Sequence, residues 1–462
     1  MAVAIRAMSS ALPGEGGLKG HVVTGNEILE MLLGLKKYPL EWFAPKKFKK
    51  LQSFIERLES TIGIKTRNIL DDKSVKYPNT YLALAAGRKT LDKAGVHPSK
   101  VQGFVYASDT PDFVFPSPGI AVAQLLEIQP KQFNNTSMAC VSIAEALSDA
   151  CFWLEQGLCE NVLILAGDVS TRLKLPKNRI EPFIFGDGFV GIYLDKKKNT
   201  GNGSCEEKGG FTFTNISVDT SQSDLFVHRH IYPSELGYFN GALMENHQDN
   251  DTGLDALGDI DSVELALLLQ DFLENTGAEL DSNTKIILPQ TGNLVRKKGI
   301  KHFHKKTGVD IEPNVLPNNS FRRHGNIGAG AVPLAWQEGL ESGDIKPEHS
   351  VVFDIAGVGG VKTVFKYDPN ATETYFVENV RNSVRPDYGR MIVEKAMEQL
   401  TRIERKRFTN GKTLNRLNLA RNVHDHISFS PVHRQINSKI PENVSEERRI
   451  EDLGSAARAE SA

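Results

Sequence analysis

The residue best placed for chemistry is a cysteine, Cys140, within the stretch from Phe133 to Gly157. Small and polar residues precede it. Apolar residues follow it at spacings of three and four, which is typical of a helix with one buried face, and Gly157 can end that helix. Unpaired amides and the helix dipole at such a start favour the thiolate over the thiol. The pattern therefore predicts a nucleophilic cysteine, with a small buried cysteine as the alternative.

The composition limits the classes of protein to consider. The chain has 462 residues, which indicates two or more domains, and its 40% hydrophobic content and 39 glycines suit a soluble α/β protein. A net charge of −2 argues against nucleic-acid binding. The four cysteines show neither CxxC pairing nor zinc-like spacing, so we expect no metal site and a reducing compartment, the cytosol. Neither a signal peptide nor a membrane span is expected.

The pattern of elements around Cys140 occurs twice along the chain: a buried strand VLILAG at 162–167 has a counterpart, VVFDIAG, at 351–357. Each is followed by a further strand. In the first half we expect a helix at 81–94 and strands at 102–107, 161–167 and within 181–194. In the second half we expect strands at 285–289, 351–357 and 361–367, with helices at 292–307 and 326–343. The repetition indicates a duplicated α/β architecture.

The chain beyond Tyr367 differs in composition. Residues 386–407 have the period of an amphipathic helix, and residues 445–462 are charged and alanine-rich, as in disordered ends. Between 401 and 421 stand seven Lys/Arg residues and one acid. This run is either the solvated face of a packed helix or a surface that attracts an acidic partner.

Eight short motifs point to one family. They are IGIKTR at 62–67, FPSP at 115–118, AC at 139–140, GDVSTR at 167–172, FGDG at 185–188, PQTGN at 289–293, HGN at 324–326 and GVGG at 357–360. In order and spacing, the chain from about Ala4 to Tyr367 resembles the β-ketoacyl-acyl-carrier-protein synthase III family of the thiolase superfamily. The resemblance implies a five-layered αβαβα fold of two similar halves and a homodimer, or a heterodimer with a related synthase.

The resemblance also implies domains and residue roles. Residues 1–200 would form the half with the nucleophilic cysteine, 201–368 the second half and 369–462 a C-terminal extension. Cys140 matches the acyl-accepting nucleophile, and its amide with that of Gly360 matches the oxyanion hole. Asn326 matches the residue that hydrogen-bonds the acceptor thioester carbonyl. Phe115 matches the gate of the partner subunit's acyl pocket, and Arg172 and Asn293 match positions at the mouth for coenzyme A or phosphopantetheine.

One position departs from the family pattern. The family's histidine in His-Gln-Ala-Asn is replaced here by Gln290. A glutamine can donate hydrogen bonds but cannot act as a general base. His324, two residues before Asn326, is the nearest candidate to replace it. Acyl transfer to Cys140 should survive the change, because a cysteine is the least demanding nucleophile.

Three functions follow as alternatives. The first loads an acyl group from coenzyme A or acyl carrier protein onto Cys140 and condenses it with a malonyl-type carbanion, in fatty-acid or polyketide biosynthesis. The second transfers the same acyl group to a nitrogen or oxygen acceptor in specialised metabolism. The third is a weakly active or inactive partner subunit. None requires a cofactor beyond the thioester substrate.

Overall fold

The computed structural model describes residues 3–32, 53, 55–57, 59–170, 183–196, 209–214, 216–218, 266–317, 320–357 and 361–377. By its contacts the chain divides into two compact units, Met1–Pro386 and Asp387–Ala462, and every described residue belongs to the first. The helix expected at 386–407, the basic run at 401–421 and the disordered end expected at 445–462 lie outside the described residues.

The first sheet has five strands in the order β1-β7-β6-β4-β5. Their bounds are β1 Val3–Ala11, β4 Gly103–Ala107, β5 Gln132–Thr136, β6 Asn161–Val169 and β7 Asp187–Lys196. Strand β4 runs parallel to both β5 and β6, whereas β7 is antiparallel to β6 and to β1. The carboxyl ends of β5, β4 and β6 therefore meet at one edge of the sheet.

The second sheet repeats this arrangement. Its strands are β8 Gly210–Thr214, β9 Ser217–Val218, β10 Thr284–Ile287, β11 Ser350–Gly357, β12 Val361–Asp368 and β13 Tyr375–Val377. Strand β10 is parallel to β11, β11 is antiparallel to β12, and β12 is antiparallel to β8. The set β8, β12, β11, β10 thus corresponds to β1, β7, β6, β4, which confirms the duplication. Strand β13 pairs with β8, so this sheet extends past the boundary expected at residue 368.

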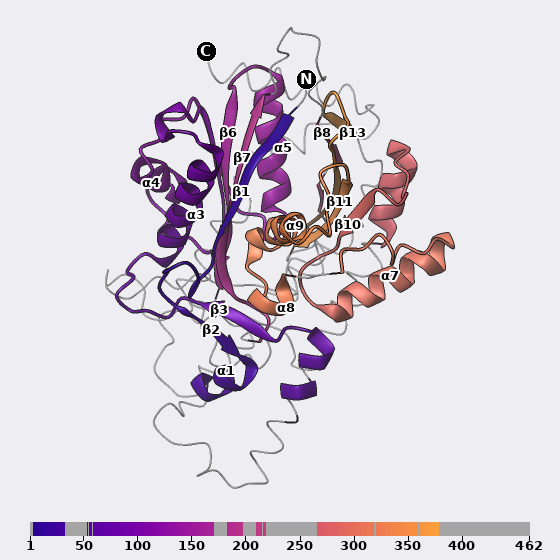
Figure 1. Cartoon of the computed structure of the whole chain (residues 1–462), viewed down its shortest axis with the longest axis horizontal. Helices are drawn as coiled ribbons and strands as arrows, with labels where there is room; N and C mark the ends of the chain where they lie inside the picture. The colour runs from indigo at the N-terminus through magenta and orange to yellow at the C-terminus, as the bar shows by residue number, and fades with distance from the viewer. Residues whose placement is uncertain are drawn as a thin grey trace, which may run out of the picture. The chain divides into compact units, whose positions relative to one another are not determined.

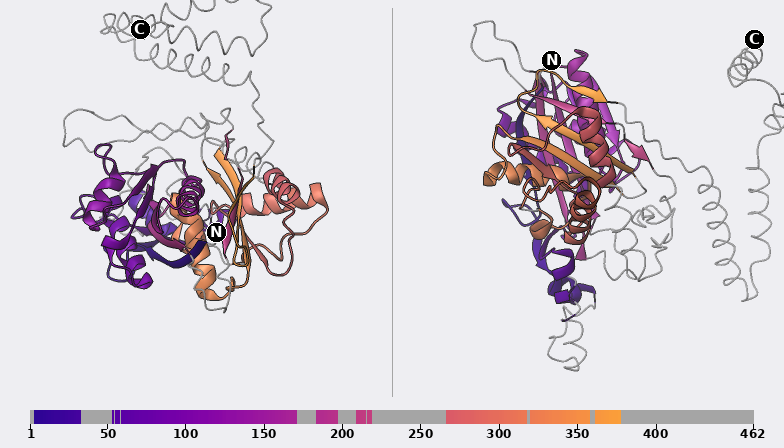
Figure 2. Two further views of the ribbon diagram at one scale, coloured as in Figure 1. Left: turned by 90° about the horizontal axis from the view of Figure 1, so that it is seen from above. Right: turned by 90° about the vertical axis from the view of Figure 1, so that its right-hand side faces the viewer.

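Helices form three layers with the two sheets between them (Figure 1). Helices α3 Pro78–Ala94 and α4 Pro118–Leu125 pack on the outer face of the first sheet. Helices α5 Ser142–Glu155 and α9 Ala331–Ser342 lie in the core that both sheets share, as the view from above in Figure 2 shows. Helix α7 Asn293–Thr307 and the helix at 266–276 cover the second sheet's outer face. The five-layered αβαβα arrangement is therefore confirmed.

The remaining elements lie outside the two sheets and the helices that cover them. Strands β2 His21–Thr24 and β3 Thr66–Ile69 form a separate antiparallel pair, and α1 Gly25–Leu32 directly follows β2. Short turns of helix are η3 Pro98–Lys100, α8 Phe321–His324 and η8 Gly328–Gly330. Within the described residues, no helix combines the length and the apolar character needed to cross a membrane.

One predicted helix begins later than expected. The helix expected from residue 326 starts only at Ala331, after the η8 turn. The backbone of Asn326 is held in a bridge to Phe185, and Gly328 has a φ of +62°. These bonds and this left-handed residue keep Asn326 in a loop, and its side chain depends on that loop for its position.

Candidate active site

Cys140 lies on a tight turn between β5 and α5. The amide of Ser142 donates to the carbonyl of Ala139 at 3.0 Å, and the Ser142 hydroxyl accepts from the amide of Met138 at 2.6 Å. Ala139 has a φ of +51°, a left-handed conformation that a non-glycine residue adopts only under strain. The turn presents a half-buried Cys140 side chain at the carboxyl edge of the first sheet, two residues before the helix that the sequence predicts.

The electrostatics of this cysteine contradict one prediction. Burial, followed by the negative charges of Asp109 and Asp168, raises the pKa of the Cys140 thiol to about 12. The Asn326 side chain and the backbone amide of Cys140 oppose this shift, because both hydrogen-bond the sulfur's charged form. The expected preference for a resting thiolate is therefore wrong, since two nearby carboxylates and desolvation outweigh the helix start.

Asn326 reaches the cysteine from the second half of the chain. Its amide donates to the carbonyl of Ile184 at 2.8 Å, and its carbonyl accepts from the amide of Gly186 at 3.0 Å. The side-chain oxygen accepts from the amide of Gly328 at 3.0 Å. Because that bond occupies the oxygen, the carboxamide NH₂ is the group that faces the sulfur of Cys140. The structure thus brings together two of the residues that the motifs single out.

A buried carboxylate, Asp168 at the end of β6, joins the loops around the site. One of its oxygens, Oδ1, accepts four hydrogen bonds and the other, Oδ2, accepts one. The donors to Oδ1 are the Ser108 hydroxyl at 2.9 Å, the amide of Asp109 at 2.8 Å, and the amide and hydroxyl of Thr110 at 3.0 and 2.9 Å. The amide of Ala329 donates to Oδ2 at 2.9 Å. Burial and the charge of Asp109 still raise the pKa of Asp168 to about 7.

A second carboxylate, Asp109, lies directly behind the nucleophile turn. Its Oδ1 accepts from the hydroxyl of Ser137 at 2.6 Å and from the amide of Ala139 at 3.1 Å. Burial raises the pKa of Asp109. The sequence analysis assigned neither carboxyl group a role, although Asp168 lies within the GDVSTR motif. A signal was available, because Asp109 follows the buried strand β4 and Asp168 ends the buried strand β6, and both strands run parallel to β5, which leads to Cys140.

Gln290, which the motif comparison matches to the family's histidine, is buried beyond the end of β10. Its Nε2 donates to the carbonyl of Leu288 at 2.7 Å, and its Oε1 accepts from the hydroxyl of Ser320 at 3.3 Å. These bonds use one of its two N–H groups and fix the carboxamide against its own strand end. Its role at Cys140 stays a prediction.

His324 does not have a nitrogen free to serve Cys140. Its Nδ1 lies 2.7 Å from Oδ1 of Asn68, and its Nε2 lies 2.8 Å from Oε1 of Glu338. The side-chain NH₂ of Asn68 donates to the carbonyl of Pro13. The side-chain oxygen of Asn68 is therefore the atom that faces the imidazole ring. Both ring nitrogens are thus engaged between β3 and α9. The hypothesis that His324 replaces the missing histidine is not supported by this geometry.

Phe115 is the most exposed large apolar side chain among the described residues, at 89%. Four more exposed apolar residues lie near it: Val114 in the same loop, Ile120 and Leu125 in α4, and Tyr77, whose ring packs edge-on against that of Phe113. A lone exposed phenylalanine needs no explanation, whereas a group of exposed apolar residues is typical of protein interfaces, so the role of Phe115 at a dimer interface stays a prediction.

The other predicted site residues are only partly described. Asn293 is the first residue of α7, and its side chain packs so closely on Gly63 of the IGIKTR motif that a Cβ there would collide with it. Arg172 and Gly360 lie outside the described residues. Among the residues that are described, no group of three His, Cys, Asp or Glu side chains could hold a metal ion.

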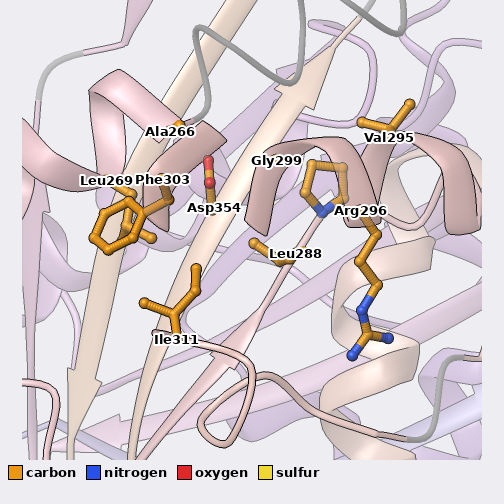
Figure 3. Close-up of a pocket in the computed structure, with 10 residues that line it drawn as sticks. Ala266, Leu269, Leu288, Val295, Arg296, Gly299, Phe303, Ile311 and Asp354 are labelled. Carbon is orange, nitrogen blue, oxygen red and sulfur yellow. The ribbon is translucent and has the colours of Figure 1, made fainter. Parts of the chain in front are cut away.

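A small cavity lies away from this site, between α7, the helix at 266–276 and the second sheet (Figure 3). Its volume of about 10 Å³ could hold one water molecule at most. Most of its walls are apolar, among them Leu269, Leu288, Phe303 and Ile311. Asp354 also lines it, and burial raises the pKa of this carboxyl well above its usual range. The cavity is too small for a substrate.

Known proteins match this chain in sequence and in fold, although no family model matches it. The β-ketoacyl-[acyl-carrier-protein] synthase III of Pectobacterium atrosepticum is 27% identical over 317 residues, covering 67% of this chain and 90% of the relative. The protein of the same name from a Ruegeria species is 26% identical over 305 residues, covering 66% of this chain and 87% of the relative.

Solved structures agree on the fold. FabH, the 3-oxoacyl-(acyl carrier protein) synthase III of Pseudomonas aeruginosa, superposes with a TM-score of 0.59 at 20% identity, over 80% of this chain and 98% of that one. OleA of Xanthomonas campestris, in a structure with bound cerulenin, gives a TM-score of 0.61 at 18% identity, over 80% and 97%. In sequence the chain is similar to β-ketoacyl-acyl-carrier-protein synthase III enzymes, and its five layers and the solved structures give it their thiolase-like fold.

Proposed function

We propose that the protein transfers an acyl group from a coenzyme A or acyl-carrier-protein thioester to Cys140 and then condenses it with a malonyl-type carbanion. The observation that carries this proposal is the meeting of Cys140 and Asn326, from opposite halves of the chain, at one buried point. It is supported by the names of the relatives, which are synthases for β-ketoacyl chains on acyl carrier protein.

In the first half-reaction the sulfur of Cys140 attacks the thioester carbonyl. The thiol proton leaves, a tetrahedral oxyanion forms, and collapse of that intermediate expels the donor thiol and leaves an acyl-cysteine. Backbone amides at the turn are the donors available to the oxyanion, as in other acyl-transfer sites. Because the resting thiol has a pKa of about 12, thiolate formation must be coupled to proton removal within the site.

In the second half-reaction a malonyl-type thioester loses carbon dioxide, and the resulting enolate attacks the acyl-cysteine carbonyl. The enolate oxygen needs hydrogen-bond donors, and the NH₂ of Asn326 is one. As the other donor we propose the N–H of the Gln290 side chain that does not bind the Leu288 carbonyl. Loss of one strong donor typically lowers such a rate by about 10²- to 10³-fold, so we expect condensation to be the slower half-reaction.

The second candidate function ends with a nitrogen or oxygen acceptor. It is favoured by Gln290, whose carboxamide is partly engaged by the Leu288 carbonyl and cannot replace an imidazole as a base. An amine acceptor brings its own lone pair to the acyl-cysteine and depends less on enolate stabilisation. A weakly active partner subunit is the third possibility, and labelling of Cys140 followed by product analysis separates all three.

Intact-mass analysis of the purified protein after incubation with acyl-coenzyme A of different chain lengths tests the first step. Wild type should gain one acyl mass, and Cys140→Ala should gain none. Cys151→Ala is a matched control, because Cys151 lies fully buried on α5 and its loss should leave labelling intact. Absence of labelling in wild type, by coenzyme A and carrier-protein donors alike, would support the inactive subunit.

Product analysis with malonyl thioester then separates the two enzyme functions. A β-ketoacyl product supports condensation. Stable acyl-cysteine that is discharged only by amines or alcohols supports the second function. A dimeric assembly, a cytosolic location and independence from further cofactors stay predictions from the sequence.

A further inference from the structure

Acylation of Cys140 requires a group that takes the thiol proton and later returns it. The family's imidazole is absent, since Gln290 occupies its place. Both nitrogens of His324 are engaged by Asn68 and Glu338. A carboxamide has no basic nitrogen. Among the residues that the structure describes, we therefore look for the proton acceptor outside the groups to which the family motifs assign a role.

The geometry directs attention to Asp109. Its Oδ1 is bound to the amide of Ala139, the residue immediately before the nucleophile, and to the hydroxyl of Ser137. Two hydrogen bonds thus hold the carboxylate against the turn that carries Cys140. The carboxyl ends of β4 and β5, which are parallel neighbours, place Asp109 and the nucleophile turn side by side.

We propose that Asp109 is the proton shuttle of this site, a deduction that rests on the proposed acyl transfer. During acylation the Cys140 S–H bond breaks, its proton passes to the Asp109 carboxylate, and the sulfur forms the new bond to the acyl carbon. The donor's carbon–sulfur bond then breaks, and its leaving sulfur takes the proton from the Asp109 carboxyl group. When an acceptor later attacks the acyl-cysteine, the departing Cys140 sulfur can recover a proton by the same route.

The surroundings of Asp109 suit this role. A base is most effective when its pKa is near the working pH, and burial raises the pKa of Asp109 from its ordinary acidic range. The charged groups that act on this corner from the packed strands are Asp168, Cys140 and, beyond them, Tyr106, whose pKa burial and the nearby carboxylates raise further. Asp109 and Asp168 repel each other's charge, so they keep a proton between them at higher pH than either would alone.

Two rates measured on Asp109→Asn test the proposal. Asparagine keeps an oxygen for the Ser137 and Ala139 bonds but removes the charge and the proton-accepting group. Alkylation of Cys140 by iodoacetamide at pH 8 should become faster, because loss of the neighbouring charge lowers the thiol pKa and each unit gives about tenfold more thiolate. Acyl transfer from acyl-coenzyme A should become slower, by about 10²- to 10⁴-fold, the usual contribution of general acid–base catalysis.

The opposite signs separate the shuttle from other roles. A purely structural role would slow both reactions, and a purely electrostatic one would accelerate both; either result overturns the proposal. Asp149→Asn is the matched control, because burial also raises the pKa of Asp149 on α5 but its partner is Asn134. Both rates should stay at the wild-type value in that variant.

A second variant and the pH dependence of the wild type test the proposal even if Asp109→Asn folds poorly. Asp109→Glu should recover part of the acyl transfer lost in Asp109→Asn. In wild type, acyl transfer should fall as the pH drops through the ionisation of Asp109; a flat profile there overturns the shuttle. If wild type is alkylated at Cys140 but never acylated by any thioester, the proposed function itself is wrong. If wild type is acylated and Asp109→Asn is acylated equally fast, only the shuttle is wrong.

Discussion

A methyl group at Gly328 would test whether the Asn326 loop rests on the buried carboxylate of Asp168. A Cβ added at Gly328 comes within 2.6 Å of the Asp168 Cγ and closer still to Oδ2. Oδ2 is the oxygen that accepts from the amide of Ala329. Gly328→Ala must therefore displace either the carboxylate or the loop, because neither atom belongs to the flexible end of a long side chain.

The cost of the substitution has two parts. Gly328 has a φ of +62°, and an L-residue in that conformation costs about 1 to 2 kcal/mol. Displacement of Oδ2 breaks a hydrogen bond to a charged group and leaves a buried amide without its partner, which adds about 1.5 to 3 kcal/mol. We expect Gly328→Ala to lower the free energy of unfolding by about 2.5 to 5 kcal/mol, measured by urea denaturation.

Gly343→Ala is the matched control. Gly343 has a φ of +80° at the end of α9, and a methyl group there would have no other atom within 4 Å. It should show the strain alone, about 1 to 2 kcal/mol. Gly328→Ala should also slow acyl transfer in the fraction that stays folded, because the Gly328 amide orients the Asn326 side chain. Equal losses of stability in the two variants would refute the proposed contact with Asp168.

Two further predictions concern parts of the chain away from this loop. Phe115→Ala should change the free energy of unfolding by less than about 0.5 kcal/mol, because the ring is 89% exposed. The same variant should weaken self-association measured by sedimentation. A wild-type protein that is monomeric at every concentration would contradict the dimer. Burial raises the pKa of Asp354 in the folded protein, so above the unfolded-state pKa wild-type stability falls as pH rises, by up to about 1.4 kcal/mol per unit. The stability gained by Asp354→Asn should therefore be larger at pH 8 than at pH 5 in urea denaturation, and a difference independent of pH would show that Asp354 does not titrate in this way.

The architecture was predictable because local sequence patterns determine most of its strands and helices. Strands β6 and β11, which follow α5 and α9, are largely apolar runs, and such runs mark buried strands whatever lies around them. Their repetition in two halves indicated the duplication before any pairing was known. The start of α9 was not predictable, because the bonds that hold Asn326 outside the helix come from Ile184 and Gly186, which lie far earlier in the chain.

The candidate site was predictable only where motifs or helix signals mark it. Cys140 was found from its place before a helix. Its protonation was predicted wrongly, because a helix start stabilises a charge by about 0.3 to 1 kcal/mol in exposed settings, whereas desolvation and two carboxylates act on the same sulfur in the structure. The spacing of Asp109 and Asp168 from Cys140 carries no such signal by itself. Their proximity follows from the order of strands β5, β4 and β6.

The same strand order brings carboxyl groups close to the turn that carries Cys140. Three parallel strands end together: the loops after β5 and β4 contribute the nucleophile and Asp109, and the end of β6 contributes Asp168. Asp168 binds the loop after β4 through Oδ1 and the loop of the other half through Oδ2. A shift of either loop would therefore move the cysteine and Asn326 relative to each other. In this arrangement the carboxyl groups hold the two halves of the site in place relative to each other and also supply proton-accepting oxygens. Asp109→Asn separates these two properties. In that variant the rates of alkylation and of acyl transfer should change in opposite directions.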